Sequence, residues 1–186
     1  MNPIINKKDF EELSTNLKDL AYSYLEKYNP SKQQLKVYLL KKYLTKFNSS
    51  NSKKEVSKII DEILNSLEKN KLINDSLYSD SKARMYLRRG YSLNKIHQSL
   101  KMKGVDQVHI KDSIEKIKKK QIEPDFVSAL KLCKRRRIGA IRPEANRELF
   151  YKKDMGILAR AGFSFEMSKR VLSLDSEEFK KLIKII

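Results

Sequence analysis

Apolar residues recur every three or four positions along most of this 186-residue chain, and that spacing constrains the fold more than any other feature. The clearest stripe consists of Val56, Ile59, Ile60, Ile63, Leu64 and Leu67. Another runs from Leu13 to Tyr28 and ends before Pro30. With only 5 Gly and 4 Pro, the chain lacks the turn residues that a β-sandwich or barrel needs. We therefore expect an all-α protein.

Helix start signals divide the chain into three groups of three helices. Ser31 and Ser52 each open a capping box, and Asn48–Ser52 is expected to form the loop between those helices. Asn74 begins the second group, and Pro124 suits the first turn of a helix that begins the third. The predicted units are residues 1–73 with an N-terminal extension, residues 74–122, and residues 123–186 with an additional C-terminal helix.

The three groups also resemble one another in sequence. Ser31, Leu35, Leu39 and Lys42 recur 61 positions later as Ser92, Ile96, Leu100 and Lys103. Leu100–Val105 recurs 58 positions later as Leu158–Phe163. Units of about 50 to 60 residues are small for independent stability, so neighbours should share apolar surface. The sequence thus predicts an elongated, curved array of three tandem three-helix repeats.

Positive charge is concentrated in the middle of the chain. The formal net charge is +18, and residues 81–160 carry 22 basic against 8 acidic side chains, or +14. No acidic residue occurs between Ser81 and Val105. Such a concentration attracts polyanions, so nucleic acid is the first candidate partner and an acidic protein groove the second. Solvated charge without a partner is the alternative, and a membrane face is disfavoured because the acid-free stretch from Ser81 to Val105 contains no Trp or Phe anchor.

The residues that carry most enzyme and cofactor chemistry are absent or isolated. The five glycines form no phosphate-binding loop, and the two histidines, His97 and His109, are expected at the surface with no metal-ligand spacing. Cys133 lies on an apolar stripe and is expected to be a core thiol, although the following cations would lower its pKa if it were exposed. We expect a monomeric cytoplasmic protein that is not an enzyme and binds no cofactor or metal. No segment is apolar enough for a signal peptide or membrane span.

Two segments carry a resemblance to a known family. The first contains Leu72-Ile73-Asn74-Asp75, Tyr78, Ala83, Tyr86, Arg88-Arg89-Gly90, Ile96, Leu100 and Lys103-Gly104-Val105. The second runs from Lys134-Arg135-Arg136-Arg137 through Lys152-Lys153-Asp154 to Leu158–Ser164. In this order and spacing they resemble RecX, the bacterial regulator of the RecA recombinase, over roughly Ala21 to Leu172. The first group departs from the family pattern, because Lys42-Tyr43 stands where a Lys-Gly-Tyr turn is usual.

The resemblance implies an all-helical modulator that lodges in the groove of a RecA filament on single-stranded DNA. It would restrain the ATPase and strand-exchange activities of the filament in recombination, DNA repair and the SOS response. Single- or double-stranded DNA is a further possible partner. The candidate contact residues for recombinase or DNA are Arg84, Arg88, Arg89, Lys95, Lys101, Lys103, Lys134, Arg135, Arg136, Arg137 and Arg160.

Two alternative functions rest on charge and helix pattern. Residues 92–117 could form a helix-turn-helix around Gly104 that binds nucleic acid directly. Against this, the second helix would begin at Asp106 and include Asp112 and Glu115, which suit a major groove poorly. An RNA-associated helical protein is the third interpretation, although the sequence contains no RNA-binding motif.

Overall fold

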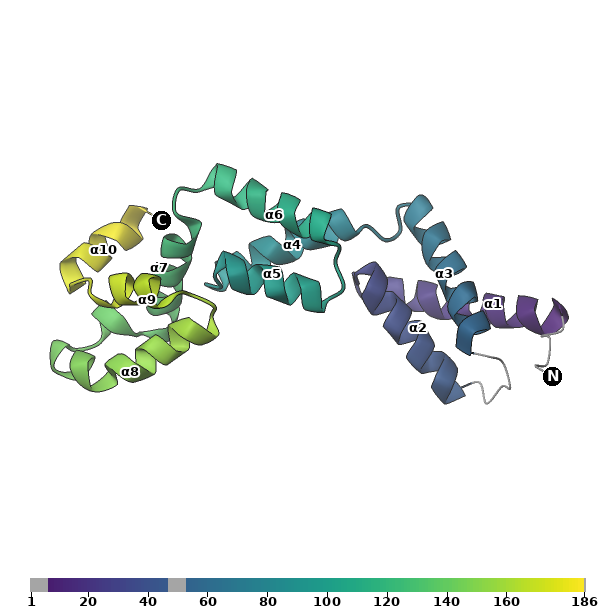
Figure 1. Cartoon of the computed structure of the whole chain (residues 1–186), viewed down its shortest axis with the longest axis horizontal. Coiled ribbons are helices and arrows are strands. Elements are labelled where there is room, and N and C mark those ends of the chain that lie inside the picture. Colours follow the sequence, from purple (N-terminus) through teal and green to yellow (C-terminus); the bar gives the residue numbers. More distant parts are fainter. Residues whose placement is uncertain (1–6, 47–52, 186) are drawn as a thin grey trace. The chain divides into compact units, whose positions relative to one another are not determined.

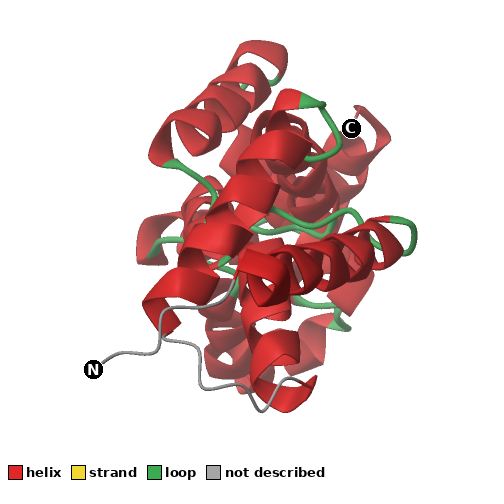
Figure 2. Cartoon of the chain, turned by 90° about the vertical axis from the view of Figure 1, so that its right-hand side faces the viewer, coloured by secondary structure: helices red, strands yellow, loops and turns green. Residues whose placement is uncertain are grey.

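The computed structural model describes residues 7–46 and 53–185, and the regular elements within these ranges are ten α-helices and one short 3-10 helix (Figure 1). Figure 2 shows helices joined by short loops and no strand in the described part of the chain. The elements are α1 (Lys7–Leu25), α2 (Lys32–Lys46), α3 (Lys53–Lys69), α4 (Asp75–Arg88), α5 (Leu93–Met102), α6 (Gln107–Lys120), α7 (Pro124–Arg136), η1 (Gly139–Ile141), α8 (Glu144–Arg160), α9 (Phe165–Leu172) and α10 (Ser176–Ile185). The all-α prediction is confirmed.

The helices follow the predicted stripes with one correction. α1 ends at Leu25, and Tyr28, which we expected on its apolar stripe, lies beyond the helix and is 58% exposed. Lys42-Tyr43, where the first group departs from the turn that is usual in the family, lies within α2, and Tyr43 is buried. The predicted loop at 48–52, including the Ser52 cap, lies outside the described residues.

The chain divides into two compact units. The first comprises residues up to 78 together with 103–106, and the second comprises residues 79–102 and 107–186. The core of the first unit lies among α1, α2 and α3, where the stripe of α3 is fully buried against Leu17 and Leu35. A core cluster of the second unit lies among α7, α8 and α9 and contains Leu130, Leu158 and Val171.

Within the first unit, Ser31 joins the start of α2 to the turn that precedes α6. Its Oγ accepts the Gln34 N–H at 3.2 Å as a helix cap and donates to the carbonyl of Lys103 at 2.6 Å. The N–H of Lys32 donates to Asp75 Oδ1 at 2.8 Å. Gly104 has a φ of +71°, and a Cβ there would clash with Gln33 Cβ. The turn therefore packs directly on the first turn of α2.

Within the second unit, Ser92 makes the same set of contacts at the start of α5. Its Oγ accepts the Lys95 N–H at 3.1 Å and donates to the carbonyl of Gly162 at 2.7 Å. The N–H of Leu93 donates to Asp125 Oδ1 at 2.7 Å. The serines that recur at a spacing of 61 thus occupy equivalent hydrogen-bonded junctions. The full three-repeat array, its shape and the unit boundaries at 73/74 and 122/123 stay predictions.

An ion pair with a buried carboxylate fixes the segment between α7 and α8. Arg142 donates to both carboxylate oxygens of Asp154 at 2.7 Å, and the Gly139 N–H donates to the same carboxylate at 3.0 Å. Asp154 is 1% exposed, so removing Arg142 would leave a buried carboxylate with only the Gly139 N–H as a partner. This pair holds η1 against α8.

Candidate functional site

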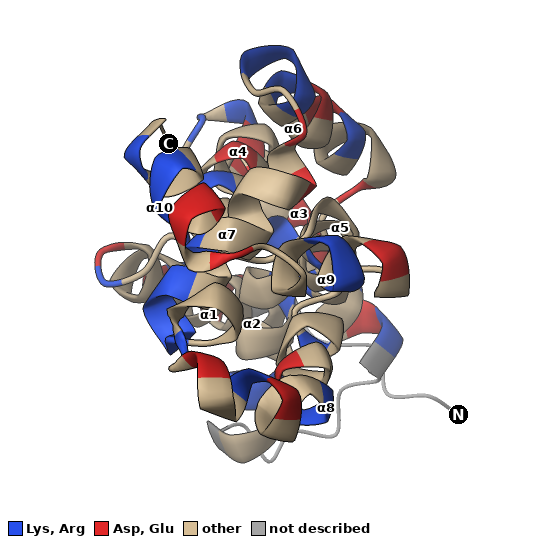
Figure 3. Ribbon diagram, turned by 90° about the vertical axis from the view of Figure 1, so that its left-hand side faces the viewer, with Lys and Arg blue, Asp and Glu red and all other residues tan. Residues whose placement is uncertain are grey.

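Most of the predicted contact residues lie at the surface. Arg84, Arg88, Arg89, Lys101, Lys134, Arg135, Arg136, Arg137 and Arg160 are exposed, whereas Lys95 and Lys103 are half-buried. Lysine and arginine recur on several helices, including α6, α8, α9 and α10, as Figure 3 shows. Two clefts of the structure are lined by some of the eleven residues. Lys103 belongs to the first compact unit and the other ten to the second.

A small basic cleft between α7 and α8 brings together three of the predicted arginines. Arg135 and Arg136 come from the last turn of α7, and Arg160 is the last residue of α8. The cleft has a volume of about 280 Å³, and its other lining residues are Tyr91, Leu132, Ile157 and Ala161. We call this the arginine cleft. Sequence spacing alone did not indicate that Arg160 meets Arg135 and Arg136, since 24 positions separate Arg160 from Arg136.

The three guanidinium groups of the arginine cleft are available for a ligand. Among the described residues, no carboxylate forms an ion pair with Arg135, Arg136 or Arg160; the ion pairs found there involve other side chains. Like charges gathered without counter-charges repel each other and raise the affinity for an anion. Arginine suits such a site because its planar fork makes paired hydrogen bonds to phosphate or carboxylate oxygens.

Arg137 and Lys134, the remaining residues of the predicted run, do not line the arginine cleft. Arg137 has a left-handed backbone with φ 54°, and its N–H donates to the carbonyls of Cys133 and Lys134 to cap α7. Its backbone therefore ends the helix, a role that the sequence interpretation missed. A contact role for its side chain stays a prediction.

Arg84 lines a second, larger hollow in the same unit. This hollow has a volume of about 640 Å³ and also contains Lys116 and Lys120 of α6, which sequence reasoning did not single out. Asp80 lies within it and accepts hydrogen bonds from Lys116 and Ser113, both at 2.7 Å. Burial opposes ionisation of Asp80, but the bonds from Lys116 and Ser113 and the charge of Arg84 together lower its pKa. The negative charge of Asp80 thus partly neutralises the positive charge of Arg84, Lys116 and Lys120 in this hollow.

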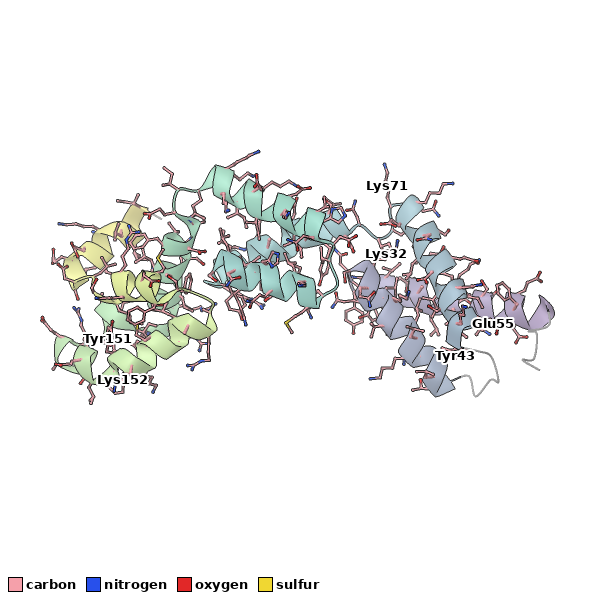
Figure 4. All side chains as sticks on the ribbon, in the orientation of Figure 1. Lys32, Tyr43, Glu55, Lys71, Tyr151 and Lys152 are labelled. Carbon is pink, nitrogen blue, oxygen red and sulfur yellow. The ribbon has the colours of Figure 1, made fainter. Side chains whose placement is uncertain are left out.

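An apolar groove separates α8 from α9 and was also missed. Tyr151, Met155, Phe163 and Phe165 line it, and its volume is about 400 Å³. Tyr151 and its neighbour Lys152 lie on α8 (Figure 4). The sequence does contain an indication of this groove. α8 carries apolar residues on two faces, so one apolar face remains when the other packs against the core.

The structure also bears on the residues that enzyme or metal chemistry would use. Cys133 is buried as expected, and burial together with the charge of Asp154 raises the pKa of its thiol to about 12. Over the described ranges, no group of three or more His, Cys, Asp and Glu side chains is arranged to hold a metal ion. His97 forms a hydrogen bond with the side chain of Gln107. None of the helices that the structure describes is long and apolar enough to cross a membrane.

Comparison with known proteins gives a consistent result. The chain is 31% identical over 161 residues to the regulatory protein RecX of Myxococcus xanthus, which covers 85% of this chain and 84% of that protein. It is 26% identical over 113 residues to the regulatory protein RecX of Agrobacterium fabrum, covering 61% of this chain and 58% of that one. No protein-family model matches the sequence.

The fold has a counterpart among solved structures. A crystal structure of regulatory protein RecX superposes with a TM-score of 0.59 at 21% identity, covering 91% of this chain and 78% of the other. This likeness supports the helical architecture, while the sequence identity to the Myxococcus protein over most of both chains establishes kinship. The chain belongs to the RecX family of regulatory proteins.

Proposed function

We propose that this protein binds RecA recombinase filaments assembled on single-stranded DNA and restrains their ATPase and strand-exchange activities. It would act in this way as a non-enzymatic regulator in recombination and DNA repair. The observation that carries the proposal is the 31% identity to a regulatory RecX protein over 85% of the chain. Within that likeness, both segments that carry the family resemblance contain exposed arginines.

The distribution of charge supports a polyanionic target. A recombinase filament on DNA offers phosphates and acidic side chains, and the chain carries a net charge of +18 with exposed arginines on α4, α7 and α8. Electrostatic attraction of this kind speeds encounter and suppresses wrong partners, whereas shape and buried contacts determine most of the lifetime of a complex. Regulation would follow if the bound protein holds neighbouring recombinase subunits in one conformation.

Direct binding of duplex DNA by α5 and α6 is the rival function. The two helices are joined by the tight turn at Gly104, as a helix-turn-helix requires. However, Ile110, Ser113 and Ile117 of α6 are buried, and Asp112 and Glu115 lie on its exposed side. Carboxylates there would face DNA phosphates and weaken binding. We therefore favour the recombinase filament as the target.

Co-sedimentation tests the proposal. Filaments of the cognate recombinase on single-stranded DNA should carry this protein into the pellet, and DNA or recombinase alone at the same concentrations should carry much less. A charge-matched basic protein of similar size serves as the control for non-specific attraction. Equal sedimentation with bare DNA and with filaments would contradict the proposal and support the nucleic-acid-binding rival.

A further inference from the structure

We propose that the arginine cleft between α7 and α8 binds a strand of single-stranded nucleic acid, with its phosphates on Arg135, Arg136 and Arg160 and a base against Tyr91. The inference rests on the proposed function, because the strand would be the single-stranded DNA of the recombinase filament. It assigns this one cleft to nucleic acid rather than to acidic groups of the recombinase.

Hydrogen bonds join the elements that line the cleft. The Ser92 N–H donates to the carbonyl of Ala161 at 3.0 Å, which ties the segment carrying Tyr91 to the end of α8. The hydroxyl of Ser128 on α7 donates to the carbonyl of Tyr91 at 2.8 Å. These bonds connect all three elements that supply the lining residues. A site with a fixed frame loses less conformational entropy when it binds a ligand.

The three arginines lie at helix ends, where backbone hydrogen bonds fix the position of the main chain. Arg135 and Arg136 precede the cap at Arg137, and Arg160 precedes Ala161, whose N–H bonds back to carbonyls of α8. Their side chains are exposed, and the described residues offer them no carboxylate partner. Three unpaired guanidinium groups around a volume of about 280 Å³ make a strong local anion site.

The other walls distinguish a nucleotide from a simple carboxylate. Tyr91 and Ile157 are half-buried and supply most of the accessible apolar surface, because Leu132 and Ala161 are only 3% and 5% exposed. The Tyr91 ring stacks on Tyr86 with centroids 5.6 Å apart and planes 15° apart. An acidic side chain would use only the arginines and leave this apolar and aromatic surface unfilled. A nucleotide supplies an anion and a flat aromatic group together, which is how proteins hold single strands without reading their sequence.

The same walls favour a single strand over a duplex. In a double helix the bases are paired and stacked inside, so a base cannot lie against Tyr91 unless it is first unstacked. The cleft is also too small to admit a helix of either nucleic acid or protein. An extended strand can place one base in the cleft while its flanking phosphates reach the arginines.

Fluorescence anisotropy of a labelled oligothymidylate of about 15 nucleotides, without recombinase, tests the inference directly. The variant R135A/R136A/R160A should bind at least tenfold more weakly, and its salt dependence should decrease by about two units of the logarithmic slope. The matched control K180A/K181A/K184A removes the same charge from exposed positions of α10 in the same unit. It should bind clearly more tightly than the cleft variant.

Two further variants distinguish specific contacts in the cleft from general attraction by positive charge. R135K/R136K/R160K keeps the charge but removes the planar forks, so we expect a loss of several-fold or more. Tyr91→Leu keeps an apolar side chain but removes the stacking surface, and it should weaken binding about tenfold with an unchanged salt slope. Thermal melts must show both variants folded. If the lysine variant and Tyr91→Leu bind like the original protein, the cleft is not a nucleic-acid site.

The assay also separates this inference from the proposed function. If the cleft variants keep oligonucleotide binding but lose filament binding, the arginines contact acidic groups of the recombinase and the inference is wrong while the function stands. If oligonucleotide binding depends on the cleft but the original protein has no affinity for filaments beyond that for DNA, the proposed function is wrong and the inference stands.

Discussion

At the scale of single residues, Cys133 shows that burial can outweigh neighbouring charge. Four cations follow it in sequence, and such a run would stabilise a thiolate in water. The side chain is only 1% exposed, and burial with the negative charge of Asp154 instead raises its pKa to about 12. The thiol therefore stays protonated and unreactive at physiological pH.

This gives a prediction for thiol labelling. The native protein should react with a thiol reagent such as iodoacetamide at least a hundredfold more slowly than the unfolded protein, because both access and thiolate formation require opening of the core. Labelling in native buffer is compared with labelling in concentrated denaturant. Fast reaction in native buffer would show that Cys133 is accessible.

The burial of a residue was predictable from sequence more reliably than its hydrogen-bond or ion-pair partner. The burial of Cys133 follows from its place on an apolar stripe. The Arg142–Asp154 pair and the cap formed by Arg137 were not predictable, because a chain with 41 basic residues offers many partners for each acid. Which pair forms depends on where the helices end and how they pack.

At the scale of elements, the turn between α8 and α9 depends on Gly162. Its φ is +89°, and a Cβ there would lie 2.5 Å from Ser92 Oγ and 2.7 Å from Lys95 Cβ. Gly162→Ala should therefore lower the free energy of unfolding by about 2 to 5 kcal/mol, from backbone strain and overpacking together. Chemical denaturation followed by circular dichroism measures the change.

Gly156, within α8, provides the matched control. A Cβ there would meet only the flexible end of Arg160, at 3.4 Å, so Gly156→Ala should raise the free energy of unfolding by about 0.5 to 1 kcal/mol. Equal effects of the two substitutions would contradict the account of the junction.

The helices themselves followed from periodicity and caps, as α3 and the Ser31 and Ser92 caps illustrate. The early end of α1 and the short helix η1 did not. Residues 26–30 combine polar side chains with one Tyr, so Tyr28 fits the stripe by spacing although the chain has already turned toward Pro30. The junction contacts of Ser31 and Ser92 were visible as a recurrence, but their hydrogen-bond partners were not.

At the scale of the whole molecule, we expect Arg84 and Arg88 of α4, and Arg89 directly after it, to contribute to binding rather than to stability. Changing Arg84, Arg88 and Arg89 to Ala should alter the free energy of unfolding by no more than about 0.5 kcal/mol each, since all three side chains are exposed. If each contact contributes about 1 kcal/mol, filament binding should weaken by about a hundredfold and lose part of its salt dependence. A salt titration of binding, beside thermal melts, measures both effects.

Two results would contradict this view of the arginines. Normal filament binding by the triple variant would show that these side chains are only solvated charge. Unfolding of the variant would show that they stabilise the fold. The two compact units and the separate clefts could not be predicted from the charge distribution, because sequence position does not tell which exposed residues share a surface.

The central claim, regulation of a recombinase filament, is tested most directly by single-stranded-DNA-dependent ATP hydrolysis of the cognate recombinase. We predict that this protein lowers the steady-state rate at amounts well below those needed to cover the DNA, because it acts on the assembled filament. Coating bare DNA would instead require near-stoichiometric amounts. An unchanged ATPase rate under conditions where the protein demonstrably binds DNA would contradict the claim.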